Sequence, residues 1–288
     1  MVLAMLIFGT IGIFRRNIAL PSAVIACVRG LAGSLFLFLF VKLRGGKLSR
    51  DAIRRNLKRL VLSGALIGFN WIFLFEAYRY TSVAIATLCY YMAPVLVILL
   101  SPFLFKERLG IGKGICVLTA LTGMFFVSGV IGGGMPQSGE MKGILLGLAA
   151  AVLYAVVVVL NKQIREIGAF DKTIVQLLTA GAVLIPYLLV TEDFSAFSLT
   201  PETFLLLLTV SVVHTGISYA LYFGSMTYLK AQTIALFSYI DPITAILLSA
   251  LLLHEELSLY GLIGAVLVLG STIASELLQL RKKSEAEK

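Results

Sequence analysis

Charge is scarce in this chain of 288 residues, and so is cysteine. Only 14% of the residues are charged and 59% are hydrophobic, whereas soluble domains carry about 25% charged and roughly 45–50% apolar residues. So little polar surface excludes a soluble fold of this size, and the same hydrophobicity excludes a disordered chain. Cys27, Cys89 and Cys116 all lie in apolar runs, so we expect buried thiols rather than a disulfide framework. A polytopic membrane protein is the class that remains.

Ten apolar runs separated by charge are candidates for membrane spans, each of which needs about 20 apolar residues. They cover about 1–15, 22–41, 60–78, 82–104, 112–131, 143–161, 173–190, 203–226, 231–253 and 258–278. The first is the weakest, because only fourteen residues precede Arg15. We expect either a helix that continues to about Asn17 with its arginines reaching the interface, or a truncated start. Ten spans leave no room for a sizeable soluble domain.

The basic residues indicate an orientation. With the N-terminus in the cytoplasm, 19 of the 24 Lys and Arg residues fall on the cytoplasmic side and 4 on the outside, while Arg29 lies within a span. This asymmetry follows the positive-inside rule and predicts that both termini are cytoplasmic. The net charge of +9 then faces anionic lipid, and we expect no nucleic-acid partner.

The sequence repeats at an offset of 148 residues. Residues 88–109 and 236–257 share ten of 22 positions, including a Tyr-x-x-Pro motif. Each half then holds five helices, and because five is odd the second half enters the membrane from the opposite side. Inverted repeats are typical of transporters, although channels also contain them. We predict an all-α polytopic membrane protein with ten transmembrane helices in two inverted five-helix repeats. The repeats are residues 1–131 and 143–288, the second with a basic cytoplasmic tail, and residues 132–142 form an external linker.

Five short motifs carry a family resemblance. They are Arg29-Gly30, Tyr91-Met92-Ala93-Pro94, Phe105-Lys106-Glu107-Arg108-Leu109, Tyr239-Ile240-Asp241-Pro242 and Leu253-His254-Glu255-Glu256-Leu257. With ten spans in two repeats, the chain resembles the EamA-type branch of the drug/metabolite transporter superfamily over nearly its whole length. The resemblance implies a multi-pass carrier of the bacterial plasma (inner) membrane, usually an exporter of amino acids or related metabolites. It also implies a central cavity lined by the first, third, fourth, sixth, eighth and ninth helices.

Two ionisable side chains are expected near the middle of the membrane, where charge is costly and often functional. Asp241 lies about eleven residues into the ninth span, which at about 1.5 Å per residue is roughly half of a core about 30 Å thick. We interpret it as a cation, amine or proton site, with a protonated aspartate bonded to a neighbouring helix as the alternative. His214 lies at a similar depth in the eighth span. Proton coupling together with Asp241 and simple packing both remain open for it.

Other charged residues favour structural readings. For Arg29, carboxylate binding remains open, but we favour a side chain that either extends to the interface or pairs structurally. Glu76 and Arg79 are expected to form an i,i+3 pair near the interface. Glu107 and Glu255 occur in both halves, and we interpret them as caps for the N-terminus of the following helix.

Aromatic side chains within the spans predict a semi-polar cavity. Tyrosine usually concentrates at membrane interfaces, so tyrosines at mid-depth indicate a space where hydroxyls find partners, although packing explains any single one. The predicted cavity residues are Asn70, Trp71, Tyr90, Tyr91, Tyr154, His214, Tyr219, Tyr222, Tyr239 and Asp241. Pro94 and Pro242 are predicted to kink the moving helices. The GxxxG patterns at 64–68 and 143–147 predict close helix contacts.

These observations favour a secondary carrier that exports amino acids or related small amphipathic metabolites by alternating access. A multidrug exporter of cationic compounds and a metabolite importer are the alternatives within the same fold. A membrane-embedded enzyme or a sensor is more remote, because no nucleophile elbow, diphosphate-binding motif or metal-ligand spacing is present. We expect a small-molecule solute and the lipid bilayer as partners, and no metal or cofactor. A monomer is the default, with a dimer left open.

Overall fold

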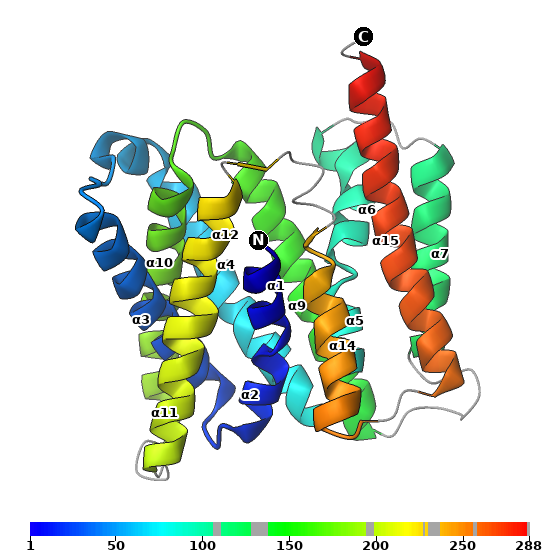
Figure 1. The fold of residues 1–288 in the computed structure, drawn as a ribbon, viewed down its shortest axis with the longest axis horizontal. Coiled ribbons are helices and arrows are strands. Elements are labelled where there is room, and N and C mark those ends of the chain that lie inside the picture. The colour runs from blue at the N-terminus through cyan, green and yellow to red at the C-terminus, as the bar shows by residue number, and fades with distance from the viewer. Residues whose placement is uncertain are drawn as a thin grey trace.

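The computed structural model describes residues 1–105, 111–127, 138–193, 199–226, 228–229, 237–255 and 258–286. These residues are helices and short connections, and no strand occurs among them (Figure 1). Three predicted features lie partly or wholly outside the described residues. They are the Lys106-to-Leu109 and Glu256-Leu257 parts of the repeat motifs, most of the linker at 132–142, and the first part of the ninth span.

The helices follow the apolar runs of the sequence. They are α1 (Val2–Gly9), α2 (Ile11–Asn17), α3 (Ser22–Leu43), α4 (Arg50–Tyr80), α5 (Val83–Tyr90), α6 (Ala93–Phe105), α7 (Ile111–Val127), α9 (Ser138–Gln163), α10 (Ala169–Thr191), α11 (Pro201–Thr209), the π-helix η2 (Val210–Ile217), α12 (Ser218–Met226), α14 (Ile240–Leu252) and α15 (Leu259–Ala286). Six helical segments are long and apolar enough to cross a membrane: α3, α4, α9, α10, the continuous segment 201–225, and α15 as far as Leu278. The prediction of an all-helical polytopic membrane protein is therefore confirmed.

Two predicted spans are broken near the centre of the bundle. The first is divided at Thr10 into α1 and α2. The fourth is divided at Tyr91 and Met92, so that Pro94 lies in the first turn of α6, where a missing backbone N–H costs no helical hydrogen bond. Each break leaves carbonyl and N–H groups without helical partners, which side chains can then bind.

The first span ends at Asn17 with the end of α2, as expected, but Arg15 does not reach the interface. Its side chain is only 4% exposed. Nη1 donates to the carbonyl of Ile18 at 3.1 Å and Nη2 donates to Ser22 Oγ at 2.8 Å. The chain turns back after Asn17, so acceptors are available beside Arg15 and its side chain need not extend into solvent.

Small residues set the closest helix contacts, as the two GxxxG patterns predict. A Cβ at Gly64 would lie 2.7 Å from the carbonyl oxygen of Gln176, and one at Gly68 would lie 2.8 Å from that of Ala180, so α4 and α10 approach backbone to backbone. A Cβ at Gly143 or Gly147 would collide with the segment around α5. Helices α7 and α15 pack on each other at one edge of the bundle (Figure 1).

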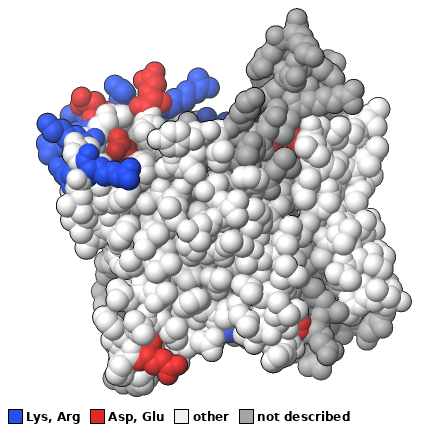
Figure 2. Space-filling model, viewed as in Figure 1, with Lys and Arg blue, Asp and Glu red and all other residues white. Residues whose placement is uncertain are grey.

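The two ends of the bundle differ in charge. Figure 2 shows Lys and Arg gathered at one end, over the connection after α3 and the start of α4. Helix α10 begins at this basic end, where Asp171 accepts a hydrogen bond from the backbone N–H of Ser49 at 3.1 Å. Helices α2, α4 and α14 finish at the opposite end, which we call the Arg16 end. The sides of the bundle between them are apolar.

Candidate functional site

A central cavity of about 550 Å³ lies among α1, α3, α4, α5, α9, α10, α12 and α14, a volume within the range of small-molecule sites. Ten of the residues predicted for the cavity or its hinges line it: Asn70, Trp71, Tyr90, Tyr91, Pro94, Tyr154, Tyr219, Tyr222, Tyr239 and Asp241. The cavity extends to Lys172 in the first turn of α10 and to Glu276 on α15, and so it extends toward the basic end.

Arg29 supplies a positive charge to the cavity wall. Its side chain is 5% exposed, and its guanidinium carbon lies 4.2 Å from the ring centre of Trp71 and 5.6 Å from that of Phe75. Nε donates to Thr215 Oγ1 at 2.7 Å. Among the described residues no carboxylate forms an ion pair with it. Cation–π contact contributes about 2 kcal/mol when desolvated, far less than a buried charge loses by leaving water, so an incoming anion would be bound favourably.

The structural pairing that the sequence favoured for Arg29 is therefore only half present. The side chain is held by an aromatic ring and a hydroxyl, which fix its position, but no described carboxylate lies within ion-pair distance of it. In the sequence, Arg29 could be recognised as a candidate functional residue because it lies inside an apolar run. Thr215, which holds it, carried no such signal, because only the wide turn of η2 brings that side chain to α3.

Asp241 supplies the carboxylate of the cavity. It lies in the first turn of α14, where the helix dipole favours negative charge. Tyr91, which ends α5, donates from its hydroxyl to Asp241 Oδ2 at 2.9 Å. The bond joins two helix ends that come from equivalent Tyr-x-x-Pro motifs of the two halves. Arg29 and Asp241 thus place a cationic and an acidic group in the wall of one cavity, which Lys172 and Glu276 also line toward the basic end.

Aromatic rings form much of the remaining wall. Tyr90 lies 5.4 Å from Tyr154 and 6.0 Å from Tyr91 between ring centres. On the other side Phe8 lies 5.3 Å from Tyr219, which stacks on Phe223 at 5.8 Å. Phe8 was missed by the sequence analysis, because a phenylalanine in an apolar run is indistinguishable from a lipid-facing one. Asn70 also lines the cavity, but its Nδ2 donates to the backbone carbonyl of Ala150 on α9 at 2.6 Å.

His214 does not line the cavity, in contrast to the prediction. Its ring is 1% exposed, packs 4.7 Å from the ring of Phe14, and has Nε2 2.8 Å from Thr10 Oγ1. The same Thr10 Oγ1 lies 2.7 Å from the carbonyl oxygen of Ile7, so this hydroxyl links the His214 ring to the backbone at the end of α1. His214 therefore connects η2 to the break between α1 and α2. No hydrogen bond joins it to Asp241 within the described residues.

Pro242 is buried in the first turn of α14 and does not line the cavity, whereas Pro94 does. Both prolines lie in the first turns of helices, and neither kinks the interior of one. They follow interruptions that the backbone has already made, which is where proline is tolerated. A hinge function for them remains a prediction.

The Arg16 end holds a hydrogen-bonded cluster that we call the Glu255 clasp: Arg16, Val83, Ser249 and Glu255. Arg16 Nη2 donates to Glu255 Oε1 at 2.7 Å, and the backbone N–H of Val83 donates to Oε2 at 2.8 Å. Ser249 Oγ also donates to Oε2. Glu255 caps α5 of the other half, so its interpretation as a cap is confirmed, but the expectation that it caps the following helix is wrong. His254, at φ +52°, turns the chain so that this carboxylate points back to the bundle.

Glu76 and Arg79 form the predicted i,i+3 pair, with Arg79 Nη1 3.1 Å from Glu76 Oε1. Arg79 is half exposed, so this pair contributes little to stability. Within the described residues no group of three or more His, Cys, Asp or Glu side chains is arranged to hold a metal ion.

Comparison with known proteins places these features in a family context. The model of the EamA-like transporter family matches residues 1–129 and 141–275. The chain is 31% identical over 269 residues to "Uncharacterized transporter YxxF" of Bacillus subtilis (strain 168), covering 93% of this chain and 85% of that one. It is 28% identical over 274 residues to an "Uncharacterized transporter" of Archaeoglobus fulgidus, covering 94% and 93%. A solved crystal structure superposes with a TM-score of 0.68 at 20% identity, covering 96% and 95%, and supports the fold.

Proposed function

The chain belongs to the EamA-like transporter family, and from that premise we propose that it exports amino acids or related small amphipathic metabolites by alternating access. Its relatives are named transporters, which favours a carrier over an enzyme. The observation that carries the proposal is that Arg29 and Asp241 line the same aromatic cavity. Arg29, which forms no ion pair with a described carboxylate, attracts a solute carboxylate. The tyrosine-bonded carboxylate of Asp241 attracts an ammonium group, and the aromatic rings of the cavity contact an apolar body.

A cationic drug is the competing solute, because Asp241 and aromatic rings also bind cations. Arg29 argues against it. A fixed guanidinium in the same cavity repels a cation that brings no anion of its own, and burial strengthens that repulsion. A zwitterion satisfies both charged groups at once.

Alternating access would follow from two inverted repeats, and helix packing supports that arrangement. When the halves are exchanged by the 148-residue offset, α1 corresponds to α9, α3 to α10, α4 to the α11–α12 segment, and α6 to α14. Helix α1 packs on α14 and α12, as α9 packs on α6 and α4. Helix α3 packs on η2, as α10 packs on α4. A symmetric set of contacts allows the halves to exchange conformations.

Location and direction complete the proposal. The basic end would face the cytoplasm of a bacterial plasma membrane. The structure would then represent an inward-facing state, because the cavity extends to Lys172 while the Glu255 clasp holds the Arg16 end. The protomer would be self-sufficient as a monomer.

Three probes that share one ring test this assignment: L-phenylalanine, phenylacetate and phenethylamine. Trp71 is the single tryptophan of the chain and lies against Arg29, so its fluorescence reports binding in the cavity. We expect phenylalanine to bind most tightly. Arg29→Gln should weaken phenylalanine and phenylacetate about 10- to 100-fold and spare phenethylamine, while Asp241→Asn should weaken phenylalanine and phenethylamine. Arg44→Gln is the matched control, because Arg44 lies 4.8 Å from the ring centre of Phe40 but is exposed.

Transport itself is tested by counterflow in proteoliposomes over a panel of amino acids. Uptake that depends on both Arg29 and Asp241 is the expected result. Absence of uptake for every amino acid, or selective uptake of phenethylamine and other cations, would refute the proposal in favour of another solute class.

A further inference from the structure

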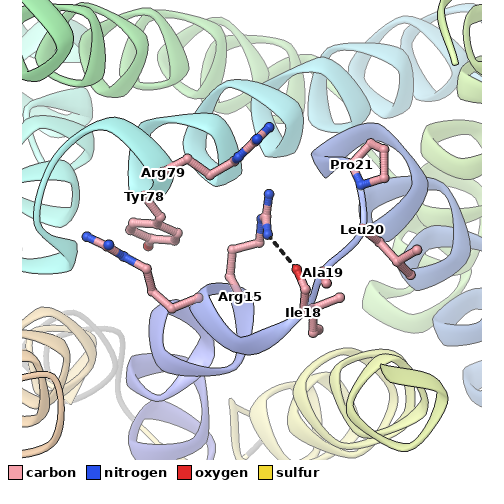
Figure 3. A pocket seen from close by; sticks show the side chains of 8 residues that line it. Arg15, Ile18, Ala19, Leu20, Pro21, Tyr78 and Arg79 are labelled. Atoms are coloured by element: carbon pink, nitrogen blue, oxygen red, sulfur yellow. Dashed lines mark hydrogen bonds between the residues drawn. The ribbon is translucent and has the colours of Figure 1, made fainter. Parts of the chain in front are cut away.

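A second pocket, of about 500 Å³, lies at the Arg16 end, outside the central cavity. Its walls are the end of α2, the connection from Ile18 to Pro21, and the end of α4. Arginines line it from both sides: Arg15 and Arg16 on α2, and Arg79 on α4. Figure 3 shows Arg15 and Arg79 on opposite walls, with Tyr78 beside them and the bond from Arg15 to the Ile18 carbonyl marked. We call it the Arg15 pocket.

The charges around the Arg15 pocket do not cancel. Arg16 is paired with Glu255 and Arg79 with Glu76. Arg15 bonds only to neutral acceptors, the Ile18 carbonyl and Ser22 Oγ, and no described carboxylate forms an ion pair with it. Its buried Nε has no hydrogen-bond partner within the part of the chain that the structure describes. A buried cation in this state is costly, so among the described side chains of the pocket one positive charge is unpaired.

Tyr78 connects this pocket to the transport path. Its side chain is 4% exposed and lines both the Arg15 pocket and the central cavity. It is thus a wall shared by two chambers, with Arg29 facing the inner chamber and Arg15 facing the outer one.

We propose that the Arg15 pocket is a second carboxylate site, at which the exported solute is held between the central cavity and the outside. The ligand is a monoanion, because one positive charge is unbalanced, and its carboxylate is bound by Arg15 with Arg79 on the facing wall. The three apolar residues Ile18, Leu20 and Pro21 receive the body of the solute. The proposal rests on the proposed function for the identity of the solute that carries the carboxylate.

The phosphodiester of an anionic lipid has the same charge and is the other source of such a group. We favour the solute, because the pocket adjoins the central cavity through Tyr78 and its floor is the chain connection at 18–21. Vesicles of different headgroup charge distinguish the two sources.

The test uses a cysteine in the pocket. Ala19 is exposed and lines it, so Ala19→Cys is alkylated with a membrane-impermeant maleimide in phosphatidylcholine proteoliposomes. The three native cysteines are buried, and the parent chain measures their background. Phenylacetate at ten times its Kd should slow alkylation about tenfold by occupying the pocket, whereas phenethylamine should not. Asn17→Cys, exposed at the same end but outside the pocket, should show no protection.

Two variants test whether the protection of Ala19→Cys depends on the arginines of the pocket. Arg15→Gln should abolish it while phenylacetate still quenches Trp71 fluorescence in the central cavity, which also shows that the variant is folded. If Arg15→Gln fails to fold, Arg79→Gln, on a half-exposed side chain, should weaken the protection instead. The proposal would be overturned if Arg15→Gln folds and Ala19→Cys is still protected. It would also be overturned if Arg15→Gln does not fold and Arg79→Gln leaves the protection unchanged.

The remaining outcomes separate this proposal from the proposed function. Trp71 quenching without protection of Ala19→Cys overturns the second site and leaves the central one standing. Protection without quenching supports the second site and counts against the central one. Protection produced by phosphatidylglycerol alone, without phenylacetate, assigns the pocket to lipid and overturns the carboxylate site.

Discussion

Removing the charge of Glu255 should open the Arg16 end. This carboxylate accepts hydrogen bonds from Arg16 at 2.7 Å, from the backbone N–H of Val83 at 2.8 Å, and from Ser249. It therefore fixes α2 and the start of α5 to the end of α14. Glu255→Gln preserves the shape but replaces one acceptor oxygen with a donor, which must face either an arginine or an N–H group.

The size of the effect follows from burial. The Glu255 side chain is 15% exposed and that of Arg16 is 35% exposed, so solvent screens the pair only in part. Hydrogen bonds to charged groups contribute about 1.5–3 kcal/mol each, and we expect the substitution to cost one of them. At about 1.4 kcal/mol per factor of ten, the population open at the Arg16 end should rise about 10- to 150-fold.

Accessibility of a cavity residue measures this shift. Leu74 lines the central cavity and is buried, so Leu74→Cys should react with an external impermeant maleimide only when the Arg16 end opens. In intact cells the reaction rate should rise with Glu255→Gln and also with Arg16→Gln. The rate increase in the double variant should be smaller than the two single effects combined, because both substitutions break the same contact. An unchanged rate in both single variants would refute the clasp as a gate.

Three further substitutions probe contacts inside the bundle. Tyr91→Phe removes the hydrogen bond to Asp241 and should cost about 0.6–1.7 kcal/mol of stability, measured by thermal unfolding in detergent. Thr10→Ala removes the hydrogen-bond partner of the buried His214 Nε2 and should lower stability by about 1–3 kcal/mol. Gly30→Ala places a Cβ 2.7 Å from the backbone of α10 and should lower stability by about 1–3 kcal/mol through overpacking.

Matched controls lie on the outer faces of the bundle. Tyr260→Phe changes a tyrosine that is 40% exposed. Thr119→Ala removes an exposed hydroxyl that bonds only within its own helix. Gly114→Ala adds a methyl group to open space. Each control should leave the unfolding temperature nearly unchanged, and a buried variant that behaves like its control would contradict the contact assigned to it.

Much of this architecture could be predicted from hydropathy and repetition. Spans such as that of α3 appear as long apolar runs, and the tyrosines of the cavity were identified because they lie too deep for an interface. The breaks could not be placed in the same way. Thr10 lies between apolar residues that would equally fit a continuous helix, and only the packing of α1 against α14 and α12 accounts for the interruption.

Ionisable residues were predicted unevenly, because depth in a helix does not specify a direction. His214 and Asp241 occur at similar depths in the sequence, yet the π-helix turns His214 toward Thr10, whereas Asp241 faces the cavity. The sequence analysis favoured a structural role for Arg29. Its actual contacts lie on α4 and η2, which are distant in sequence, so they could not be identified in advance. That no described carboxylate forms an ion pair with Arg29 becomes visible only when those helices are assembled.

The wide turn of the π-helix η2 determines which side chains after it face the cavity. A π-turn holds one residue more than an α-helical turn, so every side chain beyond it is rotated by about 100° from the register set by α11. Tyr219, Tyr222 and Phe223 all follow it and all face the cavity. Loss of a single codon within 210–217 would leave the composition almost unchanged and turn this aromatic wall away from the solute. In this segment, chain length constrains the site as strongly as residue identity does.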